Sequence, residues 1–273
     1  MKDIQGIKRK YKEKLLQQYA VETFDNEEQK RIYCDRVAEA WAYLDGIIPE
    51  NFRDYTIFDF NGKSTDKSLI PPDIASLARN LICQFCWGKS WKKIGKKFKT
   101  DDDKKVFFRN NSVILKRLNR GNNVAIFGKS DGPIGRTMVA SIIMKEAIRL
   151  RLKPENIGHT YDWIDFPSLK DSLRNDTSAL ADCRSCDWLV VDDIIKNSFP
   201  SLKQRAYLSD LLDPFFMYRL RNNLPTILVF KFDIRDKTDN LESTMGLGIA
   251  NVVNNKKTLK IPLCSGLVTK DNE

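Results

Sequence analysis

The stretch VAIFGKSDGPIGRT, residues 124–137, decides the fold of this chain. The four apolar residues at 124–127 predict a short buried strand, and the pattern that follows from Met138 predicts an amphipathic helix. A glycine-rich turn separates the two elements. Glycine lets backbone N–H groups approach a phosphate closely, and the N-terminus of a helix favours the negative charge. The order of strand, glycine-rich turn and helix therefore predicts a phosphate-binding loop.

The residues expected to contact a nucleotide run from the end of this strand into the first turn of the helix. They are Gly128, Lys129, Ser130, Asp131, Gly132, Pro133, Ile134, Gly135, Arg136, Thr137 and Met138. Gly135 would permit close approach of the backbone to phosphate, and the Thr137 hydroxyl is expected to reach a Mg²⁺ ion.

The loop departs from the usual G-x-x-x-x-G-K-[ST] pattern in two ways. Six residues separate Gly128 from Gly135, and Arg136 stands at the position of the lysine. Arginine keeps the positive charge but spreads it over a flat guanidinium group. Such a site is compatible with nucleotide binding and poor hydrolysis. Lys129 is either a displaced phosphate-binding lysine or a solvated loop lysine.

A second motif, WLVVDD at residues 188–193, has the form of a Walker B strand, in which apolar residues precede two acids. Asp192 would hold Mg²⁺ through water, and Asp193 would polarise an attacking water. The alternative is a buried strand that ends in a solvated Asp-Asp turn. The glycine-rich loop upstream favours the Walker B interpretation.

Short apolar runs alternate with helical segments along the rest of the chain. Strands are expected at 124–127, near 159–161, at 188–191, at 226–230 and at 256–264, with helices at 138–152, 166–174 and 202–221. This alternation predicts an α/β fold with a mostly parallel sheet flanked by helices. Residues 10–44 read as two helices with a break at Asp25 and Asn26. Their apolar face is expected to dock on the core or on a partner, and both remain open.

A series of motifs then occurs in a fixed order between residues 46 and 232. They are IP at 48–49, FRDY at 52–55, FDF at 58–60, YDWI at 161–164 with Leu169, DWLVVDD at 187–193 and RNNLPTI at 221–227. In this order they resemble the DnaC/DnaI-like replicative helicase loaders, which are AAA+ P-loop ATPases related to IstB.

The resemblance implies an AAA+ ATP-binding core at residues 63–273, preceded by a helical partner-binding extension and linker at residues 1–62. It implies ATP or ADP with Mg²⁺ as ligands. The implied function is that of a helicase loader, which binds a replicative DNA helicase and single-stranded DNA during replication initiation, gated by ATP. Self-association into a ring or spiral on the partner is part of the same expectation.

The resemblance also suggests the residues that would act in ATP hydrolysis, namely Asp193, Arg136 and Lys231. Lys231 stands where the family has its sensor 1 asparagine, which is a further departure. No arginine follows Arg235, so the late arginines of the family are missing. Arg219 or Arg221 would then have to act between subunits, unless each pairs with surface acids.

A basic, aromatic-rich stretch at residues 87–99 is the candidate nucleic-acid-binding segment. Its lysines are Lys89, Lys92, Lys93, Lys96, Lys97 and Lys99, with no acid among them. Lysines neutralise phosphates and aromatic rings stack on bases. The same spacing also suits an ordinary amphipathic helix with Trp91, Ile94 and Phe98 in the core. The net charge of +10 and pI of about 9.2 favour contact with a polyanion.

The composition is that of a globular protein, with 42% hydrophobic and 30% charged residues. The sequence contains no apolar run long enough for a membrane span and starts without a signal peptide, so a cytoplasmic location is expected. A phage or mobile-element origin is a hypothesis. The two C-x-x-C pairs, Cys83/Cys86 and Cys183/Cys186, are interpreted as reduced core cysteines rather than a zinc site.

Two other functions share this core. One is an IstB-like transposition regulator, which would partner a transposase instead of a helicase. The other is a pseudo-ATPase, a scaffold that binds DNA or protein, and Arg136, Lys231 and the missing late arginines favour it.

Overall fold

The structure is a computed structural model that describes residues 4–18, 24, 26–48, 120–128, 135–151, 161–175, 178–195, 202–235 and 241–263. The chain divides into two compact units. One contains residues 1–60, 79–116 and 141–159, and the other contains residues 61–78, 117–140 and 160–273. The domain boundary predicted at residue 62 lies outside the described residues and stays a prediction.

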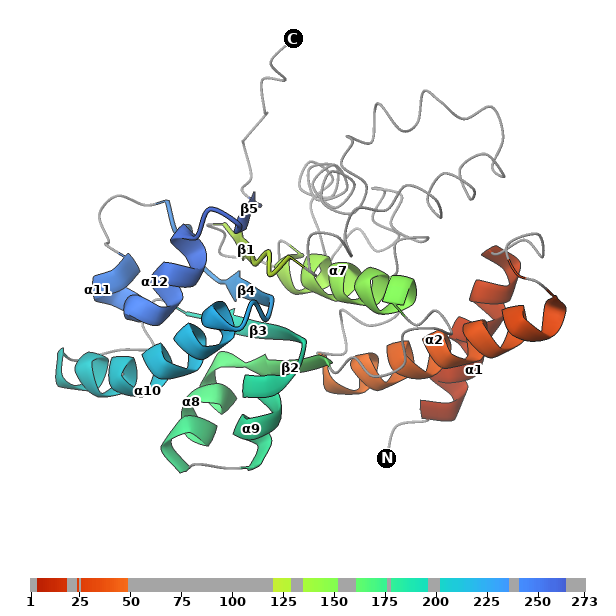
Figure 1. Cartoon of the computed structure of the whole chain (residues 1–273), viewed down its shortest axis with the longest axis horizontal. Coiled ribbons are helices and arrows are strands. Elements are labelled where there is room, and N and C mark those ends of the chain that lie inside the picture. Colours follow the sequence, from red (N-terminus) through yellow and green to blue (C-terminus); the bar gives the residue numbers. More distant parts are fainter. Residues whose placement is uncertain are drawn as a thin grey trace, which may run out of the picture. The chain divides into compact units, whose positions relative to one another are not determined.

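The second unit is built on one sheet of five parallel strands (Figure 1). The strands are β1 (Val124–Phe127), β2 (Tyr161–Asp165), β3 (Trp188–Ile194), β4 (Thr226–Phe230) and β5 (Leu259–Pro262). Their order in the sheet is β2-β3-β4-β1-β5. The expected α/β class with a parallel sheet flanked by helices, as in a P-loop fold, is confirmed. The second strand begins at Tyr161, later than the expected segment near residues 159–161.

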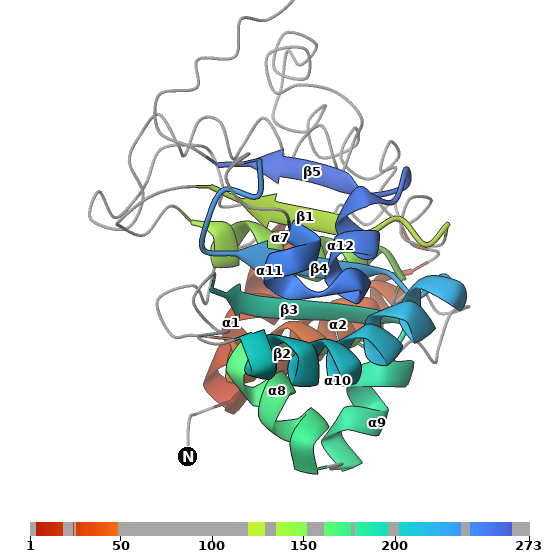
Figure 2. The same cartoon turned by 90° about the vertical axis from the view of Figure 1, so that its left-hand side faces the viewer.

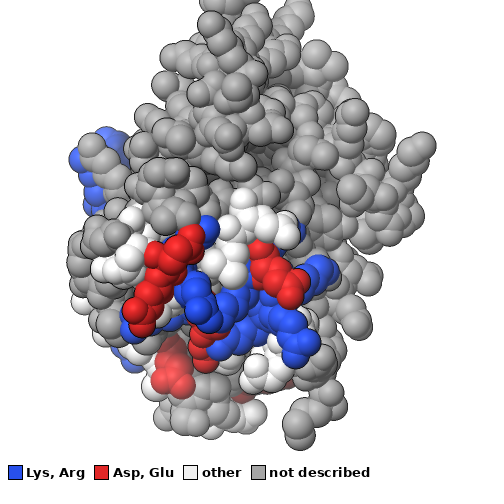
Figure 3. Space-filling model, turned by 90° about the vertical axis from the view of Figure 1, so that its right-hand side faces the viewer, with Lys and Arg blue, Asp and Glu red and all other residues white. Residues whose placement is uncertain are grey.

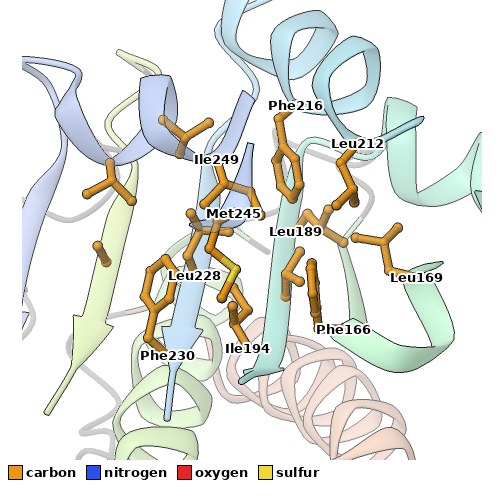
Figure 4. Packing of buried hydrophobic residues seen from close by; sticks show 14 of the residues in the cluster. Phe166, Leu169, Leu189, Ile194, Leu212, Phe216, Leu228, Phe230, Met245 and Ile249 are labelled. Carbon is orange, nitrogen blue, oxygen red and sulfur yellow. The ribbon is translucent and has the colours of Figure 1, made fainter. Parts of the chain in front are cut away.

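Helices cover one face of this sheet, as Figure 2 shows for α10, α11 and α12. The helices of this unit are α8 (Phe166–Asn175), α9 (Ser178–Ser185), α10 (Leu202–Arg221), α11 (Leu241–Met245) and α12 (Leu247–Asn254). Apolar side chains from β3 and β4 meet side chains from these helices in one cluster (Figure 4). Leu189 and Leu228 from the strands and Phe216 and Ile249 from the helices are all fully buried there. Residues that point to the opposite face, such as Val190, are buried as well.

Helix α7 (Arg136–Arg151) follows the glycine-rich loop, as the sequence predicts. Residues 136–140 belong to the sheet unit, and residues from 141 onward belong to the other unit. The division therefore falls within one continuous helix.

The first unit contains α1 (Ile4–Gln18) and α2 (Glu27–Ile47), which confirms the predicted break near Asn26. Asn26 caps α2, since its side chain accepts a hydrogen bond from the Gln29 N–H at 2.8 Å. Ion pairs join the two helices, with Lys8 and Lys12 of α1 near Asp35 of α2 at 3.2 and 2.8 Å. Basic and acidic side chains accordingly lie beside each other on the face in Figure 3.

The buried side of α2 packs against residues of α7 that belong to the same unit. The Trp41 indole N–H donates to the Lys145 carbonyl at 2.8 Å, and the Tyr33 hydroxyl donates to the Arg149 carbonyl at 2.7 Å. The docking of the N-terminal helices, open at the level of sequence, is thus made at least in part with this chain itself.

Candidate nucleotide site

The glycine-rich loop and the two acids of β3 lie at the same edge of the sheet. The strands are all parallel, so their carboxyl ends meet there, and β1 and β3 are both neighbours of β4. In open parallel sheets this edge is where ligands bind. The topology therefore brings together two motifs that are distant in the sequence.

A direct contact joins these motifs. The Thr137 hydroxyl donates a hydrogen bond to Asp192 Oδ1 at 3.3 Å, across 55 residues of sequence. Asp192 is only 4% exposed, and the same Oδ1 accepts the backbone N–H of Asp193 at 2.8 Å. The interpretation of DD as a solvated turn is wrong for Asp192, because its carboxylate is buried against the start of α7.

A bulge in β3 separates the roles of the two acids. Val191 pairs with Leu228 and Ile194 with Phe230, so β3 has one residue more than β4 over this interval. Bulges of this kind re-aim side chains and are frequent beside active sites. Asp193 lies at the bulge with φ of 63°, a left-handed conformation that Asp adopts more readily than most residues. Its side chain remains 34% exposed, unlike that of Asp192.

Lys231 reaches this bulge from the next strand. Its backbone N–H donates to the Ile194 carbonyl at 2.8 Å, which continues the pairing of β3 with β4 beyond Phe230. Its ammonium group forms an ion pair with the Asp193 carboxylate. The lysine at the sensor 1 position therefore contacts the acid expected to polarise water.

Arg136 is tied back to the beginning of the loop. Its guanidinium donates to the Gly128 carbonyl at 2.6 Å. Gly135 precedes it with φ of 73°, a conformation that favours glycine, and accepts the Val139 N–H at 2.9 Å as α7 begins. This arginine is placed at the loop, but its contact is with the backbone of the chain.

The residues described at this site suit a hard cation. Thr137 supplies a hydroxyl oxygen and Asp192 a carboxylate oxygen, the donor types that Mg²⁺ prefers. No group of three or more His, Cys, Asp or Glu side chains in the described part of the chain forms a metal cage. This agrees with Mg²⁺, which takes few protein ligands and completes its shell with water and phosphate oxygens.

Burial raises the pKa of Asp192 to about 6, although the hydrogen bonds from the Asp193 N–H and from Thr137 oppose the shift. The folded protein therefore binds this proton more tightly than the unfolded chain does. Its contribution to stability is fully present below about pH 4 and is lost as pH rises toward 6.

We expect Asp192→Asn, which removes the buried charge, to stabilise the protein at pH 8 by about 1–3 kcal/mol and to change little at pH 4. Urea unfolding of nucleotide-free protein at both pH values measures this, with the exposed acid of Asp210→Asn as control. An equal effect at the two pH values would contradict the account.

Other predicted site residues are distributed as follows. Met138 is buried at the start of α7. The loop residues Lys129, Ser130, Asp131, Gly132, Pro133 and Ile134 lie outside the described residues, as do the lysines of residues 87–99. Their roles stay predictions.

Arg219 does not have the role considered for it between subunits. It is 0% exposed and donates to the carbonyls of Cys183, Cys186 and Pro225 at 2.8, 2.9 and 2.8 Å. A guanidinium held in this way cannot reach a neighbouring molecule. Arg221 is exposed at the end of α10.

Cys183 and Cys186 are buried free thiols. The Cys183 thiol donates to the Asp162 carboxylate at 3.0 Å, and that of Cys186 is shared among nearby carbonyls. Burial raises the pKa of both thiols, that of Cys186 to about 11. Neutral thiols in the core agree with the interpretation of this pair as reduced core cysteines. Cys83 and Cys86 lie outside the described residues.

Among the described helices, none combines the length and apolar character that crossing a bilayer requires.

Comparison with known proteins identifies two helicase-related structures. DnaI is 14% identical to this chain, covering 80% of it and 92% of its own length, with a TM-score of 0.43. The DnaC helicase loader is 17% identical, covering 63% of this chain and 97% of its own length, with a TM-score of 0.40. These are the names to which the sequence motifs point. No protein-family model and no curated protein matches the chain.

Proposed function

We propose that this chain binds a nucleoside triphosphate, as a complex with Mg²⁺, at the carboxyl edge of its sheet. The observation that carries the proposal is the hydrogen bond between Thr137 and Asp192, which unites the loop and the acidic strand end. Residues 128–138 would surround the phosphates with backbone N–H groups. Thr137 and Asp192 would hold Mg²⁺, which supplies charge stabilisation to the phosphates when bound.

In this proposal Asp193 polarises the attacking water and Arg136 provides positive charge near the phosphates. Hydrolysis is slow, for two reasons visible in the contacts. Arg136 is bonded to the Gly128 carbonyl, and Asp193 is paired with Lys231. The site is therefore suited to holding a nucleotide for a long time, as a switch does.

The proposed nucleotide is ATP, and the proposed process is loading of a replicative DNA helicase at the initiation of DNA replication. The support is the ordered motif series that resembles DnaC/DnaI-like loaders. The N-terminal helices would bind the helicase, and the lysines of residues 87–99 would guide single-stranded DNA. Assembly into a ring or spiral would take place on the helicase.

The test is a titration of the purified chain with ATP and Mg²⁺, followed by size-exclusion chromatography with the replicative helicase of the same source. We expect micromolar ATP binding and a complex whose amount depends on ATP. Asp192→Asn should weaken binding of ATP with Mg²⁺ by about tenfold or more, because it removes the charged ligand of the cation. Lys260→Asn, an exposed position on β5, is the matched control.

The outcomes separate the competing functions. ATP binding without a helicase complex would remove the loader function and leave the nucleotide site. Recovery of a transposase instead of a helicase would favour the IstB-like alternative. Absence of ATP binding at millimolar concentration would establish the scaffold.

A further inference from the structure

The ion pair between Lys231 and Asp193 joins two residues whose backbones are fixed. Asp193 is held at the bulge of β3, and Lys231 is held by its N–H bond to Ile194 at 2.8 Å. The two side chains therefore meet without a long search through rotamers. Their contact is a consequence of strand register and does not depend on a flexible loop.

The pair is partly open to solvent. The Lys231 side chain is 47% exposed and that of Asp193 is 34% exposed. An ion pair with this exposure is weak and exchangeable, and a stronger competitor can replace one partner. A divalent cation near Thr137 and Asp192 would be such a competitor, because it would interact with the same acidic strand end.

Charge at this strand end depends on Lys231. Asp192 and Asp193 are adjacent, and without a counter-ion they would present two carboxylates to a cation. With Lys231 in contact, the charge of Asp193 is already balanced. A cation approaching Asp192 then meets less negative potential than the two acids alone would supply.

We propose that Lys231 is the resident counter-ion of Asp193, and that it weakens divalent-cation binding at this edge and withholds Asp193 from the attacking water. The part that concerns water rests on the proposed nucleotide function, whereas the part that concerns the cation does not. Lys231 is in this account a positioning residue that acts through Asp193. Its contact with Asp193 assigns it a role opposite to the catalytic one expected from its sensor 1 position.

The first test measures cation binding without nucleotide. Mn²⁺ prefers the same oxygen ligands as Mg²⁺ and can be followed in the full chain by electron paramagnetic resonance. We expect Lys231→Asn to bind Mn²⁺ about three- to tenfold more tightly than the parent, as loss of an exposed counter-ion implies. Lys231→Arg keeps the charge and should behave like the parent, and Lys260→Asn should change nothing.

A double-mutant cycle shows whether the effect passes through Asp193. In an Asp193→Asn background, Lys231→Asn should no longer strengthen Mn²⁺ binding, because the carboxylate that it would release is absent. Equal Mn²⁺ affinity in the parent and Lys231→Asn, or an increase that persists without Asp193, would overturn the proposal.

The second measurement is ATP turnover with Mg²⁺. Lys231→Asn should raise the turnover rate about three- to tenfold, and Lys231→Arg should not. Tighter Mn²⁺ binding in a protein that binds no ATP would support the counter-ion role and remove the nucleotide function. ATP binding with unchanged Mn²⁺ affinity in Lys231→Asn would do the reverse.

Discussion

Arg219→Met is expected to lower the free energy of unfolding of the sheet unit by about 3–5 kcal/mol. The guanidinium is fully buried, and it donates to carbonyls at the end of α9 and before β4 as well as to the Thr226 hydroxyl at 3.0 Å. Methionine keeps the apolar stem but leaves these acceptors without a donor. Unsatisfied buried acceptors are more costly than the hydrogen bonds are stabilising.

Urea unfolding followed by tryptophan fluorescence and circular dichroism measures this loss. Arg221→Met is the matched control, because it lies two positions along the same helix and is exposed. It should change stability by less than about 0.5 kcal/mol. Arg219→Lys should recover only part of the loss, since an ammonium group cannot reproduce the guanidinium fork. Equal losses for the two methionine variants would contradict the role of Arg219.

Lys145→Met is expected to lower the stability of the unit that contains α1 and α2 by about 3–5 kcal/mol. The ammonium group lies 2.6 Å from the Asp45 carboxylate, and the two side chains are 1% and 0% exposed. It also donates to the Tyr11 hydroxyl at 2.7 Å, and that hydroxyl in turn bonds to Asp45. The single substitution would leave a carboxylate buried without its counter-ion.

The double variant Asp45→Leu with Lys145→Met separates this mechanism from simple loss of packing. Removing both charges should recover most of the stability, because the desolvation cost of the pair disappears with them. Addition of Tyr11→Phe should recover more, since the hydroxyl then needs no partner. Lys8→Met, which breaks a more exposed pair with Asp35, should lose less than about 1 kcal/mol. A double variant as unstable as the single one would show that burial of charge is not the cause.

The strands that the sequence predicts well are those with uninterrupted apolar runs. β1, β3 and β4 are buried on both faces, so their residues need no alternation. β2 begins later than expected because two of its five residues are acids, which weakens the apolar signal. Helix α12, LGIANVVN, is apolar on most sides and short, so it shows no helical periodicity.

The candidate site was predictable to the level of its motifs. A glycine-rich loop and a pair of acids after two parallel strands must share one edge of the sheet, whatever the details. The Lys231–Asp193 pair was not predictable, because it depends on a single additional residue in β3 opposite β4. The burial of Arg219 also depends on long-range packing, with contacts that span 33 to 36 residues.

The most direct test of the nucleotide site is hydrogen–deuterium exchange of the full chain with and without ATP and Mg²⁺. The account predicts slower exchange in two separate peptides, one covering residues 128–140 and one covering residues 188–195, at the same ATP concentration. Asp192→Asn should remove both effects at that concentration. Protection of only one of these peptides, or of neither, while ATP is bound elsewhere would show that the loop and the acidic strand end do not form one site.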